Sequence, residues 1–370
     1  MNPIGRFATW VEVDLSAIRA NVGAFRQKTG VDVIAVVKAN AYGHGAVESA
    51  RAALEGGASR LAVARVDEAL ELRQADIKAP ILILGWTPPD RVAEMIQSGV
   101  SLTVWSEAQI EHASAIASGL GETALIHLNV DTGMSRLGTR PEQVLRLAQL
   151  ADQLTGCRME GIFTHFARAD EKDPAPTLEQ HARFLQVLEQ LDEAGVEPGM
   201  IHAANSAASL RFPDTWHDAI RIGIAMYGLL PSRECPLPDE IKPALSWKSQ
   251  LVQVKTIEPD RGVSYGHIYH SSRRERIGTV PVGYADGFRR TGMNEVLIAG
   301  ARCPVVGRVT MDYIMVNLDA LPTAEPGMQV VLIGQQGGES ITAEGIGDRW
   351  NTINYEVTSG IAQRVIRIYT

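Results

Sequence analysis

Cysteine is scarce in this chain and offers no covalent framework. The 370 residues include three cysteines, Cys157, Cys235 and Cys303, which lie far apart and form no CxxC pair. No histidine stands near them at the spacing of a metal site, so neither a disulfide scaffold nor a structural zinc site is supported. The sequence therefore predicts free thiols in a reducing compartment and no metal.

Excess positive charge and long apolar runs are also missing. The net charge of -8 at pH 7 gives neither the basic footprint of a nucleic-acid-binding protein nor a polybasic membrane patch. No apolar run approaches the length of a membrane span, and residues 1–10 lack the charged-then-apolar pattern of a secretion signal. We therefore expect a cytoplasmic protein that binds neither nucleic acid nor membrane. No GxGxxG motif follows an apolar run, so a dinucleotide site has no support.

What the sequence does contain is a repeated alternation of short apolar runs and helical patterns. The strand-like runs are 33–38, 60–65, 81–86, 101–105, 124–130, 161–166, 200–205 and 220–227. The helical patterns between them include 46–54, 67–74, 90–98, 107–117, 142–154 and 178–194. This alternation implies βαβ units and a parallel sheet. Eight units over roughly 200 residues match a closed (β/α)8 TIM barrel better than an open doubly wound sheet. The predicted fold class is therefore α/β.

The composition and the secondary-structure pattern of the chain change near residue 230. A proline-rich stretch at 230–238 is typical of a linker, and strand patterns dominate beyond it. We therefore predict a barrel domain at 1–230 and a mostly-β domain at 231–370. Because chain ends often meet, the opening strand within residues 1–13 has a possible place in the second domain.

Lys38 ends the first apolar run, and small residues and glycines follow it. The carboxyl ends of barrel strands are where this fold builds its active sites. An amine in partly apolar surroundings has a lowered pKa, so that it can attack a carbonyl and form a Schiff base. A surface lysine that caps a strand is the alternative interpretation.

Other polar groups follow the later strands and would converge on the same rim. They include Arg136, His165, Asn205-Ser206, Arg221 and Gly223-Ile224. Arg221 lies inside an apolar run, where a charge needs a partner, and His165 is a plausible neighbour. Small residues after strands seven and eight stand where barrels commonly bind phosphate. Together with a buried lysine, this set indicates a pyridoxal phosphate site.

The stretch 36–45, VVKANAYGHG, resembles the cofactor-lysine motif of the alanine racemases. The resemblance continues in order through 131–138, 164–166, 205–206, 221–228, 263–266, 283–287, 309–312 and 354–356, and thus covers essentially the whole chain. It implies that Lys38 forms the internal aldimine with pyridoxal 5'-phosphate. The residues that match the family's phosphate contacts are Tyr42, Ser206, Gly223, Ile224 and Tyr355, with Asn205 beside them. The residues that match its ring and carboxylate contacts are Arg221, His165, Arg136, Met311 and Asp312.

The resemblance also implies a second base and a homodimer. Racemisation needs one base on each face of a planar Cα, and Tyr265 matches the family's second base. In the family this tyrosine comes from the partner subunit. Lys38 would then handle the D-face proton and Tyr265 the L-face proton, and the D-alanine formed would supply peptidoglycan.

One departure and two discriminators accompany the resemblance. Many relatives have a carbamylated lysine where this chain has Asn129. We expect Asn129, with a bound anion such as chloride, to hold Arg136 instead. Tyr355, beside the substrate side chain, leaves room for a methyl group. Tyr284 matches a residue that lines the family's narrow access route. Both residues favour alanine as the substrate, with serine a weak one.

Three other functions are compatible with parts of this pattern. A serine or broader-specificity racemase of the same fold is the nearest alternative. A non-catalytic cofactor-binding protein would lack the β domain and Tyr265. A decarboxylase of basic amino acids would usually need a catalytic cysteine in the β domain, and Cys303 lies in no such motif.

Overall fold

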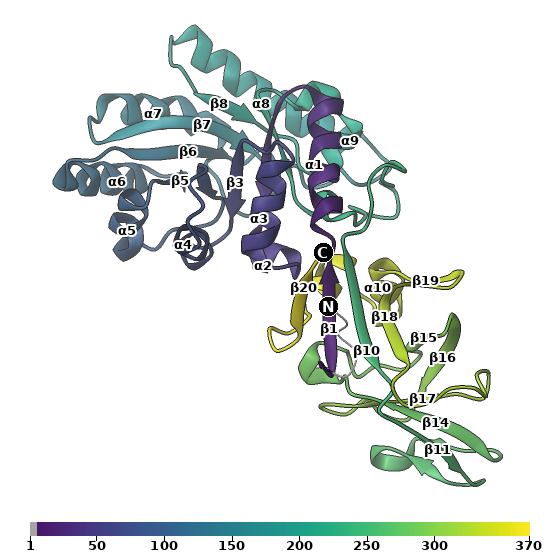
Figure 1. The fold of residues 1–370 in the computed structure, drawn as a ribbon. Coiled ribbons are helices and arrows are strands. Elements are labelled where there is room, and N and C mark those ends of the chain that lie inside the picture. The colour runs from purple at the N-terminus through teal and green to yellow at the C-terminus, as the bar shows by residue number, and fades with distance from the viewer. Residues whose placement is uncertain (1–5) are drawn as a thin grey trace. The chain divides into compact units, whose positions relative to one another are not determined.

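The computed structural model describes residues 6–370, which divide into two compact units. One unit comprises Ser16–Pro243, and the other comprises Ala244–Thr370 with the N-terminal residues up to Leu15. Figure 1 traces the chain through both. None of the helices between residues 6 and 370 combines the length and apolarity that a bilayer crossing requires.

The first unit is a parallel barrel. Its strands are β2 (Asp32–Val36), β3 (Arg60–Val63), β4 (Ile81–Ile83), β5 (Val100–Val104), β6 (Ala124–Val130), β7 (Cys157–Thr164), β8 (Met200–His202) and β9 (Ala219–Ile222). They pair in parallel in the order β8-β7-β6-β5-β4-β3-β2-β9. Two backbone hydrogen bonds, Asp218 N–H to Ile201 O at 3.0 Å and Arg221 N–H to Ala204 O at 2.9 Å, join the last strand to β8. The predicted (β/α)8 barrel is therefore confirmed.

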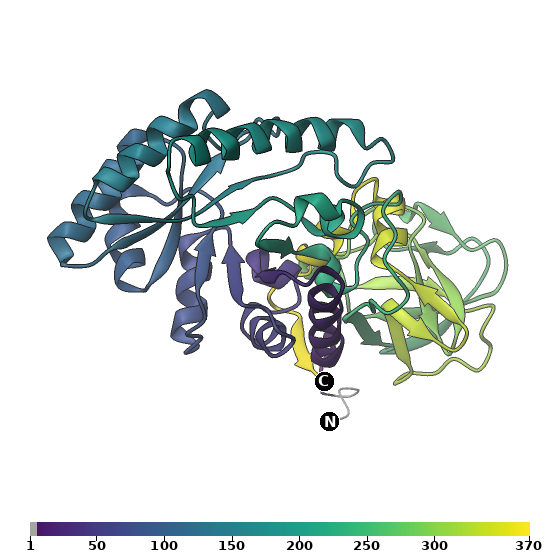
Figure 2. The same ribbon diagram turned by 90° about the horizontal axis from the view of Figure 1, so that it is seen from above.

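Helices cover the outside of these strands (Figures 1 and 2). They are α1 (Leu15–Thr29), α3 (Ala46–Glu55), α4 (Val66–Gln74), α5 (Val92–Gln97), α6 (Glu107–Leu120), α7 (Pro141–Gln153), α8 (Ala175–Glu193) and α9 (Ser206–Arg211), with short 3-10 turns η1 (Pro89–Arg91), η2 (Pro213–Thr215) and η3 (Ile224–Tyr227). The segment α2 (Lys38–Tyr42) is instead a short left-handed turn that follows β2.

Helix α7 illustrates why these segments are helical. It opens with Pro141, whose missing N–H costs nothing at a helix start. It buries Val144, Leu147, Ala148 and Ala151, a spacing that places all four on one face. Burial of a side chain such as Val144 contributes about 1.5–3 kcal/mol relative to leaving it exposed.

The second unit is built on mostly antiparallel strands. They are β1 (Thr9–Val13), β10 (Leu245–Gln250), β11 (Gln253–Ile257), β12 (Gly262–Val263), β13 (Tyr269–His270), β14 (Glu275–Val280), β15 (Glu295–Ile298), β16 (Ala301–Val306), β17 (Ile314–Asn317), β18 (Gln329–Gln336), β19 (Glu339–Ile341) and β20 (Ile366–Tyr369). The large sheet has the order β11-β14-β17-β16-β15-β18-β10-β1-β20, and β1 pairs with β20 in parallel. Helices α10 (Ala343–Trp350) and α11 (Asn354–Ser359) and turns η4 (Tyr265–His267) and η5 (Tyr284–Asp286) complete the unit.

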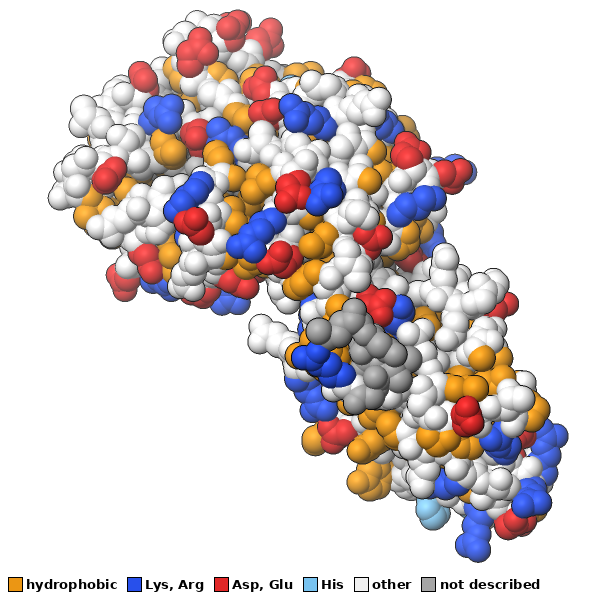
Figure 3. Space-filling model, in the orientation of Figure 1, with side chains coloured by type: hydrophobic (Ala, Val, Ile, Leu, Met, Phe, Trp, Pro, Cys, Tyr) orange, Lys and Arg blue, Asp and Glu red, His pale blue; other side chains and the backbone are white. Residues whose placement is uncertain are grey.

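The surface has no obvious segregation of charge on the face shown in Figure 3, where lysine and arginine side chains are interspersed with aspartate and glutamate. Such mixing fits the modest net charge of -8. It favours solubility over attraction to a polyanion.

Candidate active site

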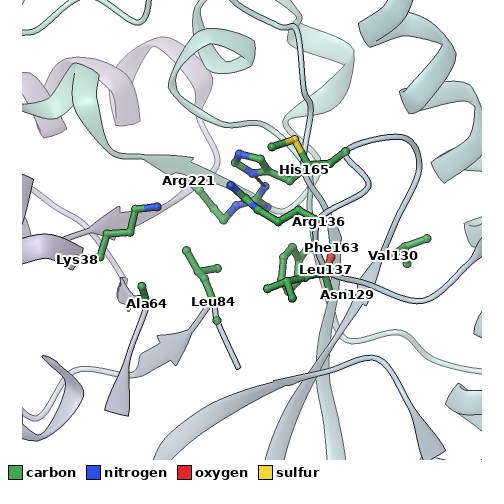
Figure 4. A pocket seen from close by; sticks show the side chains of 12 residues that line it. Lys38, Ala64, Leu84, Asn129, Val130, Arg136, Leu137, Phe163, His165 and Arg221 are labelled. Carbon is green, nitrogen blue, oxygen red and sulfur yellow. Dashed lines mark hydrogen bonds between the residues drawn. The ribbon is translucent and has the colours of Figure 1, made fainter. Parts of the chain in front are cut away.

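A cavity of about 250 Å³ opens among the carboxyl ends of the barrel strands. Its polar lining consists of Lys38, Asn129, Arg136, His165 and Arg221, and apolar side chains complete its wall. Figure 4 shows the Lys38 side chain extending toward the group formed by Arg221, Arg136 and His165. Four of the residues that the sequence places on this rim thus line one pocket, and Asn129 is with them.

Lys38 stands at the start of a turn with an unusual backbone. The strand before it ends at Val36, two residues earlier than the apolar pattern predicts. Ala39, Asn40 and Ala41 each have φ of 53°, and Tyr42 has φ of 54°. A residue with a side chain pays about 1–2 kcal/mol in this left-handed region. The turn therefore persists only because its surroundings hold it.

Several hydrogen bonds hold this turn. The Ala46 N–H donates to Asn40 Oδ1 at 2.8 Å, and the Ala41 N–H donates to Val37 O at 2.9 Å. The Ala39 N–H donates to the Glu68 carboxylate at 2.6 Å. The turn thereby fixes the backbone from which the Lys38 amine reaches the pocket. Burial and the charge of Arg136 lower the pKa of Lys38, while Glu68 opposes them. This shift favours the uncharged form of the amine, which is the nucleophilic form.

Arg221 is buried and held from several sides. Its Nη1 donates to His202 Nδ1 and His202 O, both at 2.8 Å, and its Nη2 donates to Thr164 O at 2.7 Å, Ala203 O at 2.8 Å and His165 Nδ1 at 3.3 Å. Burial lowers the pKa of Arg221 to about 9, so the guanidinium still carries its charge at neutral pH. Its Nε–H makes no hydrogen bond to any residue from 6 to 370. Arg221 therefore keeps one donor for a group in the pocket.

An arginine can only donate, and this fixes the protonation of its neighbours. His202 Nδ1 must accept, so its proton lies on Nε2, which donates to His127 Nδ1 at 2.9 Å. His127 Nε2 then donates to Glu160 at 3.2 Å. Burial holds the pKa of both histidines below the ordinary value. A hydrogen-bonded chain thus runs from the arginine in the pocket to a carboxylate inside the barrel.

The backbone of β7 makes room for this chain. The register with β6 shifts between Met159 and Gly161, so Glu160 is the extra residue of a bulge. A Cβ on Gly161 would lie 2.5 Å from His127 Nδ1, and only glycine fits there. Burial disfavours the Glu160 carboxylate, but hydrogen bonds from His127 and Ser101 and the charge of Arg60 outweigh it and lower its pKa to about 2.

Glu160→Gln is expected to change stability in acid. A carboxylate with a depressed pKa contributes stability that is complete above its ordinary pKa of 4.5 and is lost as pH falls toward about 2. The parent should therefore exceed the variant in free energy of unfolding by about 1–2 kcal/mol at neutral pH, with the difference closing in acid. Urea titrations over this pH range measure it, with the exposed Glu142→Gln as control. A gap that stays constant down to about pH 2 would contradict the assignment.

Arg136 is not held as directly as the sequence suggested. Arg136 and Asn129 line the same cavity, but among residues 6–370 no hydrogen bond joins their side chains. The two side chains are therefore not joined by a direct hydrogen bond, and the expected link through a bound anion stays a prediction.

The residues expected to bind phosphate form a group of donors. Ser206 Oγ accepts from the Gly223 N–H at 2.9 Å and the Ala225 N–H at 3.4 Å, which leaves its own proton to donate. A Cβ on Gly223 would lie 2.5 Å from the Tyr42 hydroxyl oxygen, so this space requires glycine. Asn205 Oδ1 caps helix α9 through the Ala208 N–H at 3.0 Å. The Ser206 hydroxyl, which keeps its proton to donate, suits a phosphate oxygen.

The remaining predicted residues belong to the β unit. Tyr265 is 72% exposed on η4, and Ser264 before it donates to Arg308 O at 2.7 Å. The turn at Tyr284 is joined to Met311, because the Ala285 N–H donates to Met311 O at 3.0 Å.

Two other residues of the β unit complete this set. Asp312 pairs with Arg364 at 2.7 Å. Tyr355 lies in α11 and is half-buried.

Four residues with evident roles in this site were missed from the sequence. Glu68, His127, Glu160 and His202 contact the Lys38 turn or lie on the Arg221 chain. Glu68 carried a local signal, since an acidic residue in the first turn of a helix often bonds backbone N–H groups. The other three come from separate strands, and no short motif connects them.

Comparison with known proteins gives a consistent result. The family profile described as "Alanine racemase, N-terminal domain" matches residues 13–231, and "Alanine racemase, C-terminal domain" matches residues 244–369. An alanine racemase of Geobacillus stearothermophilus is 47% identical over 98% of this chain and 93% of its own length. One from Desulfovibrio desulfuricans is 43% identical over 97% of each chain.

Solved structures agree. The Bacillus anthracis alanine racemase with bound L-Ala-P has a TM-score of 0.93 and 44% identity, with 98% of this chain and 95% of that one covered. A histidine racemase from Leuconostoc mesenteroides has a TM-score of 0.91 and 29% identity, with 99% of each chain covered. The fold therefore serves more than one substrate side chain.

Proposed function

The chain belongs to the alanine racemase family, and from that membership we propose that it interconverts L-alanine and D-alanine with two bases, Lys38 and Tyr265, and a pyridoxal 5'-phosphate cofactor. The observation that carries this proposal is the barrel pocket in which the Lys38 amine faces Arg221, Arg136 and His165. An isomerase of this kind would supply D-alanine for peptidoglycan.

The chain's own residues fit the cofactor. Lys38 would hold its aldehyde, and Ser206, Gly223, Ile224 and Tyr42 would hold its phosphate, with Tyr355 added by the family resemblance. When bound, such an aldehyde supplies an electron-accepting system that makes the Cα proton of an amino acid acidic. The donor left on Arg221 Nε is suited to a ring nitrogen.

The choice of arginine at this place supports racemisation. A guanidinium keeps its protons at neutral pH, so Arg221 can donate a hydrogen bond to the ring nitrogen without giving up a proton. With the cofactor bound, stabilisation of negative charge at Cα would then be limited, and the two bases would return the proton quickly. His165, whose pKa is held well below the ordinary value by burial and by Arg221, Arg136 and Lys38, adds no further charge.

Two bases on opposite faces of Cα account for inversion. We assign the D-face proton to Lys38 and the L-face proton to Tyr265 of the partner subunit, so that the active unit is a homodimer. The exposure of Tyr265, at 72%, supports a role toward a second molecule. Arg136, the Met311 backbone and Asp312 would receive the substrate carboxylate.

An anion is the proposed link between Asn129 and Arg136. Both side chains line the pocket without a direct hydrogen bond, and an amide N–H with a guanidinium suits chloride. A bromide soak read by anomalous diffraction checks this site. The three cysteines are free and buried, which agrees with the proposed cytoplasmic location.

Alanine is expected to be the preferred substrate, with serine a weak one. Tyr355 and Tyr284 are bulky phenols at positions that the resemblance assigns to the side-chain pocket and the access route. Purified protein should form D-alanine from L-alanine at least about 10-fold faster than D-serine from L-serine at equal concentration, and added pyridoxal phosphate should restore activity after its removal. Chiral chromatography measures both products, with L-histidine as a third substrate. Equal rates for alanine and serine would favour the broader racemase.

A further inference from the structure

The Lys38 turn and helix α4 are joined through one side chain. Glu68 Oε1 accepts the Ala39 N–H at 2.6 Å, next to the reactive lysine. Glu68 Oε2 accepts the Ala64 N–H at 2.8 Å and the Arg65 N–H at 3.0 Å, at the start of α4. The two carboxylate oxygens therefore serve two separate segments.

This arrangement needs a carboxylate. Each oxygen acts only as an acceptor, whereas a glutamine side chain has one acceptor and one NH2 donor. An amide could bond the start of α4 or the Ala39 N–H, but it would face the other with a donor. The left-handed turn after Lys38, with φ of 53° at Ala39, would then lose the bond that lies next to the lysine.

We propose that Glu68 is a positioning residue for Lys38, because its carboxylate ties the left-handed turn to α4 and places a negative charge near the amine. This inference rests on the proposed role of Lys38 in racemisation. Glu68 also acts on the amine electrostatically: it raises the pKa of Lys38 against burial and Arg136. The carboxylate thus helps to orient the turn that carries the lysine and partly offsets the effects of burial and Arg136 on the pKa of its amine.

If Glu68 were only a helix cap, its replacement would affect stability but not the Lys38 amine. Gln109 provides a matched control for this alternative. Gln109 Oε1 accepts the Trp105 N–H at 2.9 Å at the start of α6, which is the same capping contact without a link to Lys38. Gln109→Ala should therefore lower thermal stability without changing the lysine. Glu68→Gln should change the lysine as well.

The decisive measurement is made on the protein freed of cofactor. The reactivity of the Lys38 amine toward an acylating reagent is followed against pH by mass spectrometry. In Glu68→Gln, half-maximal reactivity should move to lower pH, because removal of a nearby negative charge disfavours the ammonium form. Gln109→Ala should match the parent.

The loaded enzyme supplies a second readout. Glu68→Gln is expected to lower kcat for alanine by about 10–100-fold, since small displacements of a reacting group are costly, whereas Gln109→Ala should stay within about 2-fold. Glu68→Asp keeps the charge and should restore the pH of half-maximal acylation but little of kcat. It also carries the test if Glu68→Gln does not fold.

The two possible failures are distinguishable. If Glu68→Gln or Glu68→Asp matches Gln109→Ala in lysine reactivity and kcat, Glu68 is a helix cap only and the inference is overturned. If the parent itself makes no D-alanine, the proposed function fails. The acylation profile of the cofactor-free protein would still decide whether Glu68 controls the Lys38 amine.

Discussion

Replacing Tyr265 by phenylalanine is expected to lower racemisation of alanine in both directions by about 10²–10⁴-fold, the usual contribution of a positioned acid or base. The change removes only a hydroxyl from an exposed side chain, so the free energy of unfolding should stay within about 0.5 kcal/mol of the parent. Attachment of the cofactor at Lys38, read as a mass increase after borohydride reduction, should be unaffected. Rates are measured by D-alanine formation and by solvent deuterium incorporation at Cα.

A neighbouring tyrosine provides the matched control. Tyr269 lies on β13 of the same unit, and its hydroxyl donates to Glu275. Tyr269→Phe makes the same chemical change and should keep the parent rate, with a small loss of stability from the missing hydrogen bond. A Tyr265→Phe variant that kept the parent rate in both directions would refute the two-base assignment.

Mixing subunits tests where Tyr265 acts. In a mixed dimer of Lys38→Met and Tyr265→Phe subunits, one site would combine an intact Lys38 with an intact Tyr265 if the tyrosine comes from the partner. Random exchange at equal amounts should then restore about one quarter of the parent activity. If Tyr265 served its own subunit, every site would carry a defect and no activity would return.

The barrel could be predicted because strands buried on both faces leave uninterrupted apolar runs. Each of the eight runs overlaps one of the strands β2 to β9, but six of them continue at least two residues past the end of the strand. The run 33–38 ends two residues beyond β2, and the run 220–227 ends five residues beyond β9. In the second, Gly223 ends the strand and apolar residues continue into η3, where hydrophobicity alone does not mark the change.

In the β unit, the ends of strands and the shortest strands were harder to predict. Residues 249–257 show one continuous strand pattern in the sequence. They contain the end of β10 and all of β11, because the chain turns at Leu251, whose N–H donates to Met328 O at 2.8 Å. Leu251 is buried, so the apolar pattern does not break there. Strands β12, β13, β19 and β20 have at most four residues each, which is too few for a strand pattern to stand out in the sequence.

The pocket could be anticipated from positions after strands, but its supports could not. Lys38, Arg136, His165 and Arg221 follow or end strands, and the fold gathers such positions at one rim. The chain from Arg221 to Glu160 depends on tautomers and on a bulge in β7. These features arise only when separate strands meet, and a single sequence carries no signal for them.

Loss of Lys38 is expected to have the largest effect of all. Lys38→Met keeps an unbranched side chain but removes the amine that would hold the cofactor and serve one face of the substrate. Racemisation should fall by at least about 10⁴-fold, and borohydride reduction should leave no cofactor attached to the chain. Persistent attachment would show that another amine holds the cofactor and would remove Lys38 from the mechanism.

The same substitution should make the cofactor-free protein more stable at neutral pH. Burial and Arg136 lower the pKa of Lys38 below its ordinary 10.5, so the ammonium form disfavours the folded state. That penalty is complete below the folded pKa and disappears as pH rises to the ordinary value. Lys38→Met should therefore exceed the parent by on the order of 1 kcal/mol in free energy of unfolding at pH 7, with the gap closing toward pH 10.5.

Urea unfolding of both proteins without cofactor measures this difference in stability, and the exposed Lys78→Met should show no such gap. If the parent and Lys38→Met were equally stable at pH 7, the pocket would accept the ammonium form at no cost in stability. The pKa of Lys38 would then not be lowered by the fold.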